Sequence, residues 1–314
     1  MTWLYSDPIF LEHITGHHPE NADRLRSILA RLEVAHLIER CKKGVFRPVA
    51  EDVLLMAHAP EVVERAKDMA QQGGGSLDPD TVVSPLSFDV ARAAVGACIS
   101  AVDAVVAGPD RTALCLVRPP GHHATPDQSM GFCLFNNVAL AALHARKKHG
   151  LSKVLIIDWD VHHGNGTQDI FYQSAGCFFL SVHRYGHGFY PGTGAAGETG
   201  TGPGLGWIKN VPLSFGIARR TYHDHFRLAL EEAADRIKPE LVLLSAGFDA
   251  HAKDPVGSLG LETEDFTSLT RAVLDVAQTH AGGRLVSCLE GGYHLAALAE
   301  SVQAHLEELL RGPA

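Results

Sequence analysis

The sequence has 314 residues, a length common for one α/β domain, and we expect a single domain over residues 1–314. Hydrophobic residues make up 46% and charged residues 20% of the chain, and the formal net charge of −9 argues against direct binding to DNA or RNA. The sequence has neither the long apolar stretch of a membrane span nor the basic start of a signal peptide. We therefore predict a cytoplasmic protein without a membrane segment.

Five short apolar runs, taken in chain order, have the length and composition of buried parallel strands. They cover residues 113–117, 154–157, 177–182, 241–244 and 285–289. Helical patterns precede, separate and follow these runs. They cover residues 88–106, 137–148, 220–237, 263–280 and 295–311. Strands that alternate with helices predict an α/β fold with a central, mostly parallel sheet and helices on both faces.

A polar segment rich in glycine and reactive side chains follows each of the five predicted strands. In chain order these segments read RPPGHHA, DWDVHHGNG, HRYGHGFYPGTG, SAGFDAHAKDP and EGGYHL. Open α/β sheets bind ligands at the carboxyl ends of their strands. Because five such segments share one edge of the predicted sheet, we expect them to form a single functional site.

The segment after the second predicted strand has the spacing of metal ligands. Asp158, Asp160 and His162 stand at positions i, i+2 and i+4, so on an extended chain their side chains point the same way. Asp249, in the SAGFDA segment at the end of the fourth predicted strand, could complete the set of metal ligands. Two carboxylates and an imidazole favour zinc, and three protein ligands leave an open position typical of catalytic zinc. The alternative is that one aspartate only caps the following segment.

Two adjacent histidines, His122 and His123, follow a loop that two prolines stiffen and in which a glycine allows a sharp backbone turn. In a rigid loop beside a metal site, such histidines are interpreted as acid and base catalysts rather than surface residues. Each requires a partner that orients its far nitrogen, and Asp158 and Asn165 are the candidates. His163 should point away from the metal ligands, so we interpret it as structural.

These segments, together with GFCLFNN and the opening HHPENADRL, resemble the histone deacetylase superfamily over nearly the whole chain. The resemblance implies the arginase/deacetylase-like fold and a zinc-dependent amidohydrolase. Asn165 in HHGNG is similar to the class II branch, because class I members carry aspartate at that position. The implied relative is therefore a class II-like, bacterial-type histone deacetylase-like amidohydrolase.

The resemblance also implies roles for individual residues. Three residues match the zinc ligands: Asp160, His162 and Asp249. Five match the residues around the reacting amide: His123 as general base and acid, His122 as its electrostatic partner, Asp158 bonded to His122, Asn165 beside His123, and Tyr293 as donor to the developing oxyanion. Five match the oxygen and backbone ligands of a structural potassium ion: Asp158, Asp160, His162, Ser181 and Val182.

Five further residues are expected to contact the substrate. Phe132 and Tyr190 match the aromatic walls of an acyl-lysine tunnel that Gly131 also lines, although the second wall is often phenylalanine. Asp80 corresponds to a rim aspartate that holds the substrate backbone, with a simple turn residue as the alternative. Val256 resembles a rim position at which a polyamine-selective class II enzyme carries glutamate.

The predicted reaction is zinc-dependent hydrolysis of an N-acyl amide on a lysine-like amine, with acetate as the expected product. An acylated lysine is the favoured substrate and an acetylated polyamine the first alternative, since both enzymes would share the catalytic residues. The second alternative is a zinc-containing acyl-lysine binding module with little turnover, against which Tyr293 argues. An arginase-like centre with two manganese ions would require more carboxylates than these segments provide.

Overall fold

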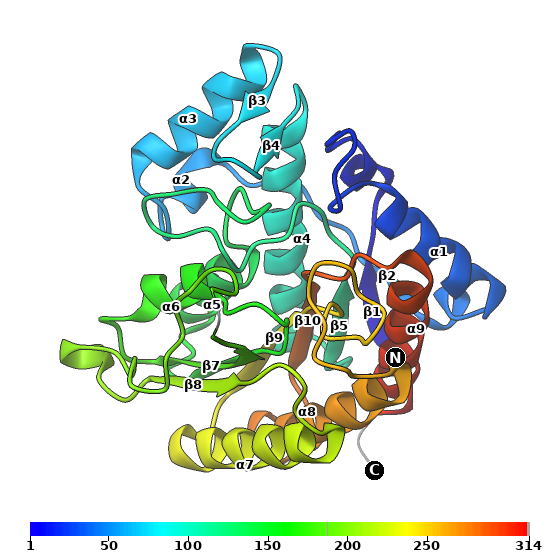
Figure 1. Ribbon diagram of the computed structural model, residues 1–314, viewed down its shortest axis with the longest axis vertical. Helices are drawn as coiled ribbons and strands as arrows, with labels where there is room; N and C mark the ends of the chain where they lie inside the picture. The colour runs from blue at the N-terminus through cyan, green and yellow to red at the C-terminus, as the bar shows by residue number, and fades with distance from the viewer. Residues whose placement is uncertain (187, 313–314) are drawn as a thin grey trace.

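Across residues 1–186 and 188–312, which this computed structural model describes, eight parallel strands form one central sheet (Figure 1). The strands lie in the order β2-β1-β5-β10-β9-β6-β7-β8. Their bounds are β1 Thr2–Tyr5, β2 Lys42–Lys43, β5 Thr112–Cys115, β6 Val154–Asp158, β7 Cys177–Arg184, β8 Ile208–Leu213, β9 Leu241–Ala246 and β10 Leu285–Leu289. The predicted fold class is confirmed, and the five predicted strands correspond to β5, β6, β7, β9 and β10.

Three strands of the sheet were not predicted, and their positions explain why. Strands β2 and β8 lie at the two edges, and β1 is the neighbour of β2. Along β8, buried positions are interrupted by half-buried ones, and Pro212 lies within the strand, as edge positions allow. An edge strand lacks the continuous apolar run by which a central parallel strand is recognised.

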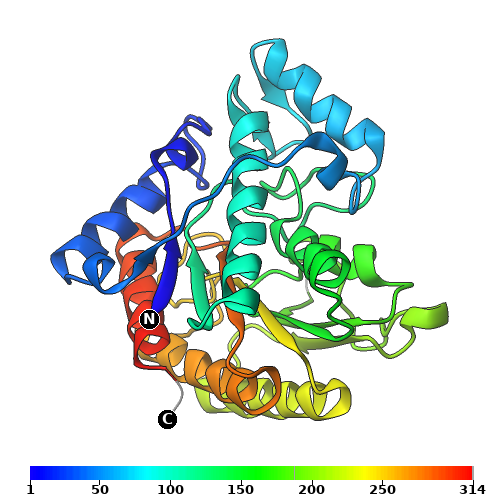
Figure 2. The same ribbon diagram turned by 180° about the vertical axis from the view of Figure 1, so that it is seen from behind.

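Helices cover both faces of the sheet (Figures 1 and 2). Helices α4 and α5 pack on one face, and α7, α8 and α9 pack on the other, where α1 lies against α9. The larger helices are α1 Asp23–Val34, α3 Pro60–Gln71, α4 Ser87–Ala107, α5 Asn137–His149, α7 Arg219–Ile237, α8 Thr263–Ala281 and α9 Leu295–Arg311. Local chemistry sets several ends: the side chain of Asn136 caps the start of α5, and Gly150, in the left-handed conformation, ends it.

A smaller layer beside α4 carries part of the site rim. It contains α2 (Glu51–Leu54), α3 and a short antiparallel pair of β3 (Gly75–Ser76) with β4 (Val82–Val83). These elements have their own apolar cluster, in which Val63 and Val83 pack with Phe88 of α4. The cluster fixes the connection between β3 and β4, in which Asp80 lies.

Helix α4 is long and apolar enough to cross a membrane by length and composition alone. In this structure 67% of its apolar window is buried, and the helix packs against β5, β10 and α5. Its composition is therefore explained by its place in the core. The cytoplasmic location stays a prediction.

The register of the central strands positions the site. Strand β6 pairs with β9 and β7, and Asp158 at the end of β6 lies opposite Ser245 of β9 and Ser181 of β7. These strands run parallel and end at one edge, so the segments that follow them start side by side. Segments separated by more than a hundred residues along the chain meet there as a result.

Candidate active site

The predicted metal ligands come together at the carboxyl edge of the sheet. Asp160 and His162 follow β6, and Asp249 follows β9, the neighbouring strand. All three side chains are buried, and each offers a ligand atom within 4.8 Å of the other two. His162 Nδ1 lies 3.1 Å from a carboxylate oxygen of each aspartate. Two carboxylates and one imidazole at this separation form a donor set suited to zinc.

Two glycines leave room for the carboxylates of Asp160 and Asp249, and backbone N–H groups donate hydrogen bonds to them. A Cβ atom on Gly247 would lie 2.0 Å from Asp160 Oδ2, and one on Gly291 would lie 2.2 Å from Asp249 Oδ2. Any side chain at either position would therefore displace a ligand. The backbone N–H of Gly291 donates to Asp160 Oδ2 over 2.9 Å, and that of Val161 donates to Asp249 Oδ1 over 2.8 Å. The residues present thus fit a zinc ion, with each carboxylate oriented by a backbone hydrogen bond.

The two adjacent histidines lie beside this triad with their rings 4.0 Å apart. His122 Nδ1 lies 2.9 Å from Asp158 Oδ2, and His123 Nδ1 lies 2.7 Å from Asn165 Oδ1. Since both acceptors are oxygen atoms, each Nδ1 carries the proton, and the Nε2 atom of His123 is left with a lone pair when the ring is neutral. The two orienting partners expected from the sequence occupy these positions.

The surroundings separate the protonation behaviour of the two histidines. Burial by itself lowers the pKa of His122, but the carboxylates of Asp158 and Asp160 outweigh burial and hold that pKa well above its usual range. Burial lowers the pKa of His123, and the charge on His122 lowers it further. One histidine is therefore held as a cation and the other as a neutral base, a division suited to acid and base roles.

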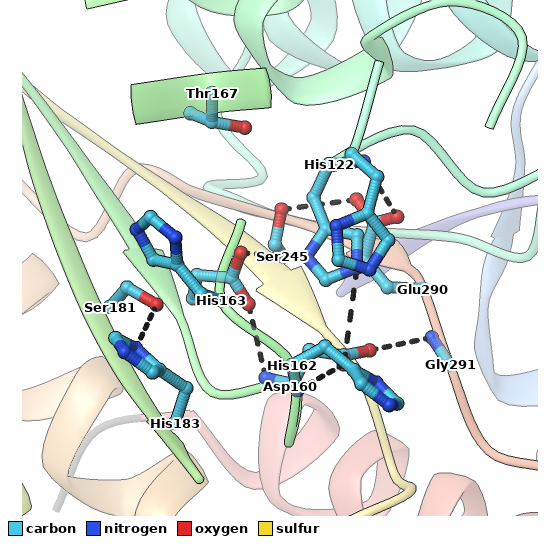
Figure 3. A network of polar contacts seen from close by, with 12 residues as sticks. His122, Asp160, His162, His163, Thr167, Ser181, His183, Ser245, Glu290 and Gly291 are labelled. Carbon is cyan, nitrogen blue, oxygen red and sulfur yellow. Dashed lines mark hydrogen bonds and ion pairs between the residues drawn. The ribbon is translucent and has the colours of Figure 1, made fainter. Parts of the chain in front are cut away.

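A buried glutamate, Glu290, fastens the histidine loop to the sheet. Its Oε2 atom accepts the backbone N–H groups of Gly121 and His122 over 2.7 and 3.2 Å. Its Oε1 atom accepts the hydroxyl of Ser245 on β9 over 3.0 Å (Figure 3). Burial raises the pKa of Glu290 to about 7. Glu290 follows β10 directly, so one side chain joins the ends of three strands.

A cavity of about 280 Å³ reaches His162 of the metal triad and His123 of the histidine pair. Its lining contains all five predicted substrate contacts together with three of the predicted catalytic and metal residues. The lining residues are Asp80, His123, Gly131, Phe132, His162, Gly188, Phe189, Tyr190, Val256 and Tyr293. The volume suits the narrow chain of an acylated amine.

Two neighbouring aromatic residues form one wall of the cavity. Phe189 stacks on the ring of His162, with centroids 4.9 Å apart and planes 6° apart. Tyr190 meets the ring of His123 edge-on, with centroids 5.1 Å apart. A Cβ atom on Gly131, whose φ is +57°, would lie 2.6 Å from His123 Cδ2 and 2.8 Å from the Tyr190 hydroxyl. Glycine at this position allows the wall to close against the base.

Tyr293 lines the cavity opposite this wall. Its ring meets the ring of Phe132 edge-on with centroids 5.8 Å apart, and the guanidinium of Arg24 lies 5.0 Å from its centroid. The backbone N–H of Tyr293 donates to Asp254 Oδ2 over 2.7 Å. Burial raises the pKa of Tyr293 well above its usual range, so the phenol keeps its proton at neutral pH. The side chain is thus a hydrogen-bond donor held in place by its ring.

The rim residues come from two separate loops. The backbone N–H of Asp80 donates to Asp78 Oδ1 over 3.0 Å, and the carbonyl of Asp80 lies 3.1 Å from His18 Nε2. Burial and the neighbouring Asp78 raise the pKa of Asp80. Across the cavity, the backbone N–H of Val256 donates to Asp254 Oδ1 over 2.9 Å. Both rim positions are therefore ordered by local hydrogen bonds.

The residues predicted to bind potassium lie at the end of β6, in the segment that follows it, and within the neighbouring strand β7. Asp158 of β6 is paired in register with Ser181 of β7, and Val182 follows it. The Ser181 hydroxyl also lies 2.9 Å from His183 Nδ1 (Figure 3). Proximity of this kind is required for a shared potassium ion, and potassium stays a prediction.

His163 faces away from the catalytic groups. Its Nδ1 atom lies 2.8 Å from Thr193 Oγ1, and its Nε2 atom lies 3.1 Å from Gln168 Oε1. Burial lowers the pKa of His163 to about 2, so the ring is neutral. These contacts agree with the structural role expected from its position beside a metal ligand.

The sequence profile of the histone deacetylase domain matches residues 18–309. The chain belongs to the histone deacetylase family. It is 40% identical to the histone deacetylase-like amidohydrolase of Pseudomonas aeruginosa, over 93% of this chain and 77% of that protein. It is 41% identical to the human polyamine deacetylase HDAC10, over 94% of this chain but only 45% of that longer protein. The crystal structure of the HDA15 HD domain superposes with a TM-score of 0.94 at 38% identity, covering 100% of this chain and 90% of that one.

Membership of the family confirms the resemblance and the assignment to hydrolytic deacetylases. Sequence reasoning nevertheless missed three residues of this deacetylase site. Glu290 begins the quoted EGGYHL segment at a strand end, a position that could have identified it, whereas its partner Ser245 is visible only in three dimensions. Phe189 precedes the predicted wall residue Tyr190, and both contribute to the cavity because the loop exposes consecutive side chains there.

Proposed function

We propose that this protein hydrolyses the acetyl amide of an acyl-lysine side chain and releases acetate, with a zinc ion held by Asp160, His162 and Asp249. The observation that carries the proposal is that His162 of this ligand set, the neutral His123 and Tyr293 line one narrow cavity, with Asp160 and Asp249 beside His162. A test is steady-state turnover of an acetyl-lysine peptide, measured before and after chelation of the metal. A hydroxamate should inhibit the reaction, because it chelates zinc through its open position.

The residues around the cavity divide the work of amide hydrolysis. Zinc in such a site supplies polarisation of the amide carbonyl and acidification of water. His123 accepts a proton from the attacking water at Nε2 and then gives that proton to the departing amine. The Tyr293 hydroxyl donates a hydrogen bond to the oxygen that becomes negative, a contribution of about 3 kcal/mol per donor in comparable sites. His122, paired with Asp158, remains a fixed cation beside these steps.

Replacing Asn165 with aspartate is expected to shift the pH dependence of the reaction. A carboxylate beside Nδ1 of His123 stabilises the imidazolium, so the pKa of His123 rises. The base must be neutral to accept a proton, and activity is lost as pH falls through its pKa. The acidic limb of the kcat/KM profile should therefore move to higher pH in Asn165→Asp.

The matched control for this substitution is Gln72→Glu, the same amide-to-carboxylate change at an exposed position after α3. Its profile should coincide with that of the parent. A limb in Asn165→Asp that stays in place or moves to lower pH would contradict the pairing of Asn165 with His123.

The rim favours an acyl-lysine over an acetylpolyamine. Val256 places an apolar side chain at the cavity mouth, where a carboxylate would attract the distant ammonium of a polyamine. An ion pair about 4 Å apart gains roughly 4 kcal/mol at an effective dielectric near 20, before desolvation costs. Two observations favour the alternative: the relative named as a polyamine deacetylase, and the acidic Asp78 and Asp80 on the opposite rim.

The substitution Val256→Glu is expected to lower the preference for peptide over diamine. The quantity to measure is kcat/KM for an acetyl-lysine peptide divided by kcat/KM for an N-acetylated diamine. We expect a ratio above one for the parent and a ratio lower by roughly tenfold for Val256→Glu, because the new carboxylate faces the free ammonium. Val256→Gln, of equal size and no charge, should leave the ratio near that of the parent. A parent that strongly prefers the diamine would make the polyamine alternative correct.

A structural potassium ion held near Asp158, Ser181 and Val182 belongs to the same proposal. Its support is the family resemblance and the register that pairs β6 with β7. Thermal unfolding of the protein in potassium and in tetramethylammonium buffers of equal ionic strength tests it. A specific site predicts a higher midpoint in potassium alone.

A further inference from the structure

A second group of metal-ligand side chains lies between helices α4 and α5, outside the catalytic site. Asp103 extends from α4, and His144 and His149 extend from α5. The Nε2 atoms of His144 and His149 lie 2.8 and 2.7 Å from one oxygen, Asp103 Oδ1. Two imidazole nitrogens and a carboxylate oxygen therefore converge, each within 4.8 Å of the others.

We propose that Asp103, His144 and His149 form a second divalent-metal site, which binds zinc and ties α4 to α5. Imidazole and carboxylate are the ligand types that borderline ions such as zinc prefer, and three of them leave a position for water. The histidine side chains are each 16% exposed and that of Asp103 is 33% exposed. The three ligands are thus held by packing yet remain open to an ion from solvent.

Lys148 determines which oxygen of the Asp103 carboxylate is free to face a metal ion. Its Nζ atom lies 2.7 Å from Asp103 Oδ2, the oxygen that the histidines leave free. The ammonium thus engages Oδ2, and Oδ1 is directed to the metal position between the two histidines. The ammonium charge also opposes a bound cation, so Lys148 should weaken the site.

The second site lies at the far end of α5 from the catalytic loop. The cap residue Asn136 donates to the carbonyl of Ala124 over 3.2 Å, directly after the catalytic histidines. His149 is the last residue of the 13-residue helix, and at 1.5 Å per residue the two ends are roughly 20 Å apart. A metal at Asp103 would act on the packing of α4 against α5 (Figure 2) and not on the hydrolytic step.

Metal content measures the proposal directly. The full chain is equilibrated with excess zinc chloride, passed over a desalting column and assayed for zinc by mass spectrometry. We expect two zinc ions per parent chain, one per chain in Asp103→Asn, and one in the double variant His144→Gln with His149→Gln. Asp103→Asn keeps an oxygen acceptor for the histidines, so it retains the local hydrogen bonds if the double variant does not fold.

Separating the two sites requires one further pair of proteins. Asp249→Ala, which removes a catalytic ligand, should still bind one zinc ion, and its combination with Asp103→Asn should bind none. Loss of zinc at the catalytic site alone would thus contradict the proposed function and leave the second site intact. His225→Gln, which removes an exposed histidine of α7, is the control and should bind two. One zinc ion per parent chain together with none in Asp249→Ala, or two in Asp103→Asn, would overturn the second site.

The substitution Lys148→Met should strengthen zinc binding at the second site, whereas the preceding substitutions remove it. Removing a unit charge about 5 Å from the divalent ion in a water-like medium should tighten binding at the second site by roughly 15-fold. Competition with a chromophoric chelator in the Asp249→Ala background reports that affinity. An ion-pair cluster that binds no metal would not compete with the chelator for zinc before or after the substitution, and this result would also overturn the proposal.

Discussion

Replacing Asp249 with alanine is expected to abolish zinc binding at the catalytic centre and, with it, amide hydrolysis. Asp249 is one of the three buried residues that we propose as zinc ligands, and the two that remain would form an incomplete site. The substitution also removes the acceptor of the Val161 N–H, which would be left unsatisfied in the core. Asp249→Asn retains that acceptor without the negative charge, so it separates loss of metal from loss of folding.

The measurements for this prediction are turnover of an acetyl-lysine peptide and bound zinc in the same sample. Chelation of the parent should stop turnover, and added zinc should restore it. Asp275→Ala removes an exposed carboxylate of α8 and should behave as the parent. Full turnover by Asp249→Ala protein without bound metal would disprove the assignment of the zinc ligands.

The substitution Tyr293→Phe is expected to lower kcat by roughly 10² to 10³ with a smaller change in KM. Phenylalanine retains the ring contacts with Phe132 and Arg24, so the change removes only the hydroxyl. A donor that acts mainly on the developing oxyanion contributes little to substrate binding, and its loss therefore appears in kcat.

Tyr190→Phe is a matched control for Tyr293→Phe within the same cavity. The Tyr190 hydroxyl is buried and has no hydrogen-bond partner among the residues that the structure describes. Its removal should therefore change kcat far less than removal of the Tyr293 hydroxyl. If Tyr293→Phe were nearly as active as the parent, Tyr293 would be a packing residue, and a binding module with little turnover would become the better interpretation.

Family membership and much of the site could be predicted because the relevant information is local. The i, i+2, i+4 spacing places Asp160 and His162 on one side of an extended chain wherever that chain lies. The run of apolar residues in β6 predicts a central strand, and the polar segment after it predicts a functional edge. Each of these inferences depends only on backbone geometry over a few residues.

Other features depend on which distant segments become neighbours. Asp249 meets Asp160 because β9 lies beside β6, although β7 and β8 intervene in the chain. Glu290 joins the histidine loop to Ser245 because β10 lies between β5 and β9. Neither pairing has a signature in sequence spacing, since many strand orders satisfy the same pattern of apolar runs.

The sequence by itself determined the strand and helix periods, the ligand types and the family of this protein. The tertiary structure decided the strand order, the edge strands β2 and β8, the neighbouring strand β1, the wall formed by Phe189, and the approach of Asp103 to His144 and His149. The physical reason is the distance along the chain over which each effect acts. Periodicity and turn chemistry act between residues close in the chain, whereas strand order and side-chain convergence follow from burying the faces of all the elements together.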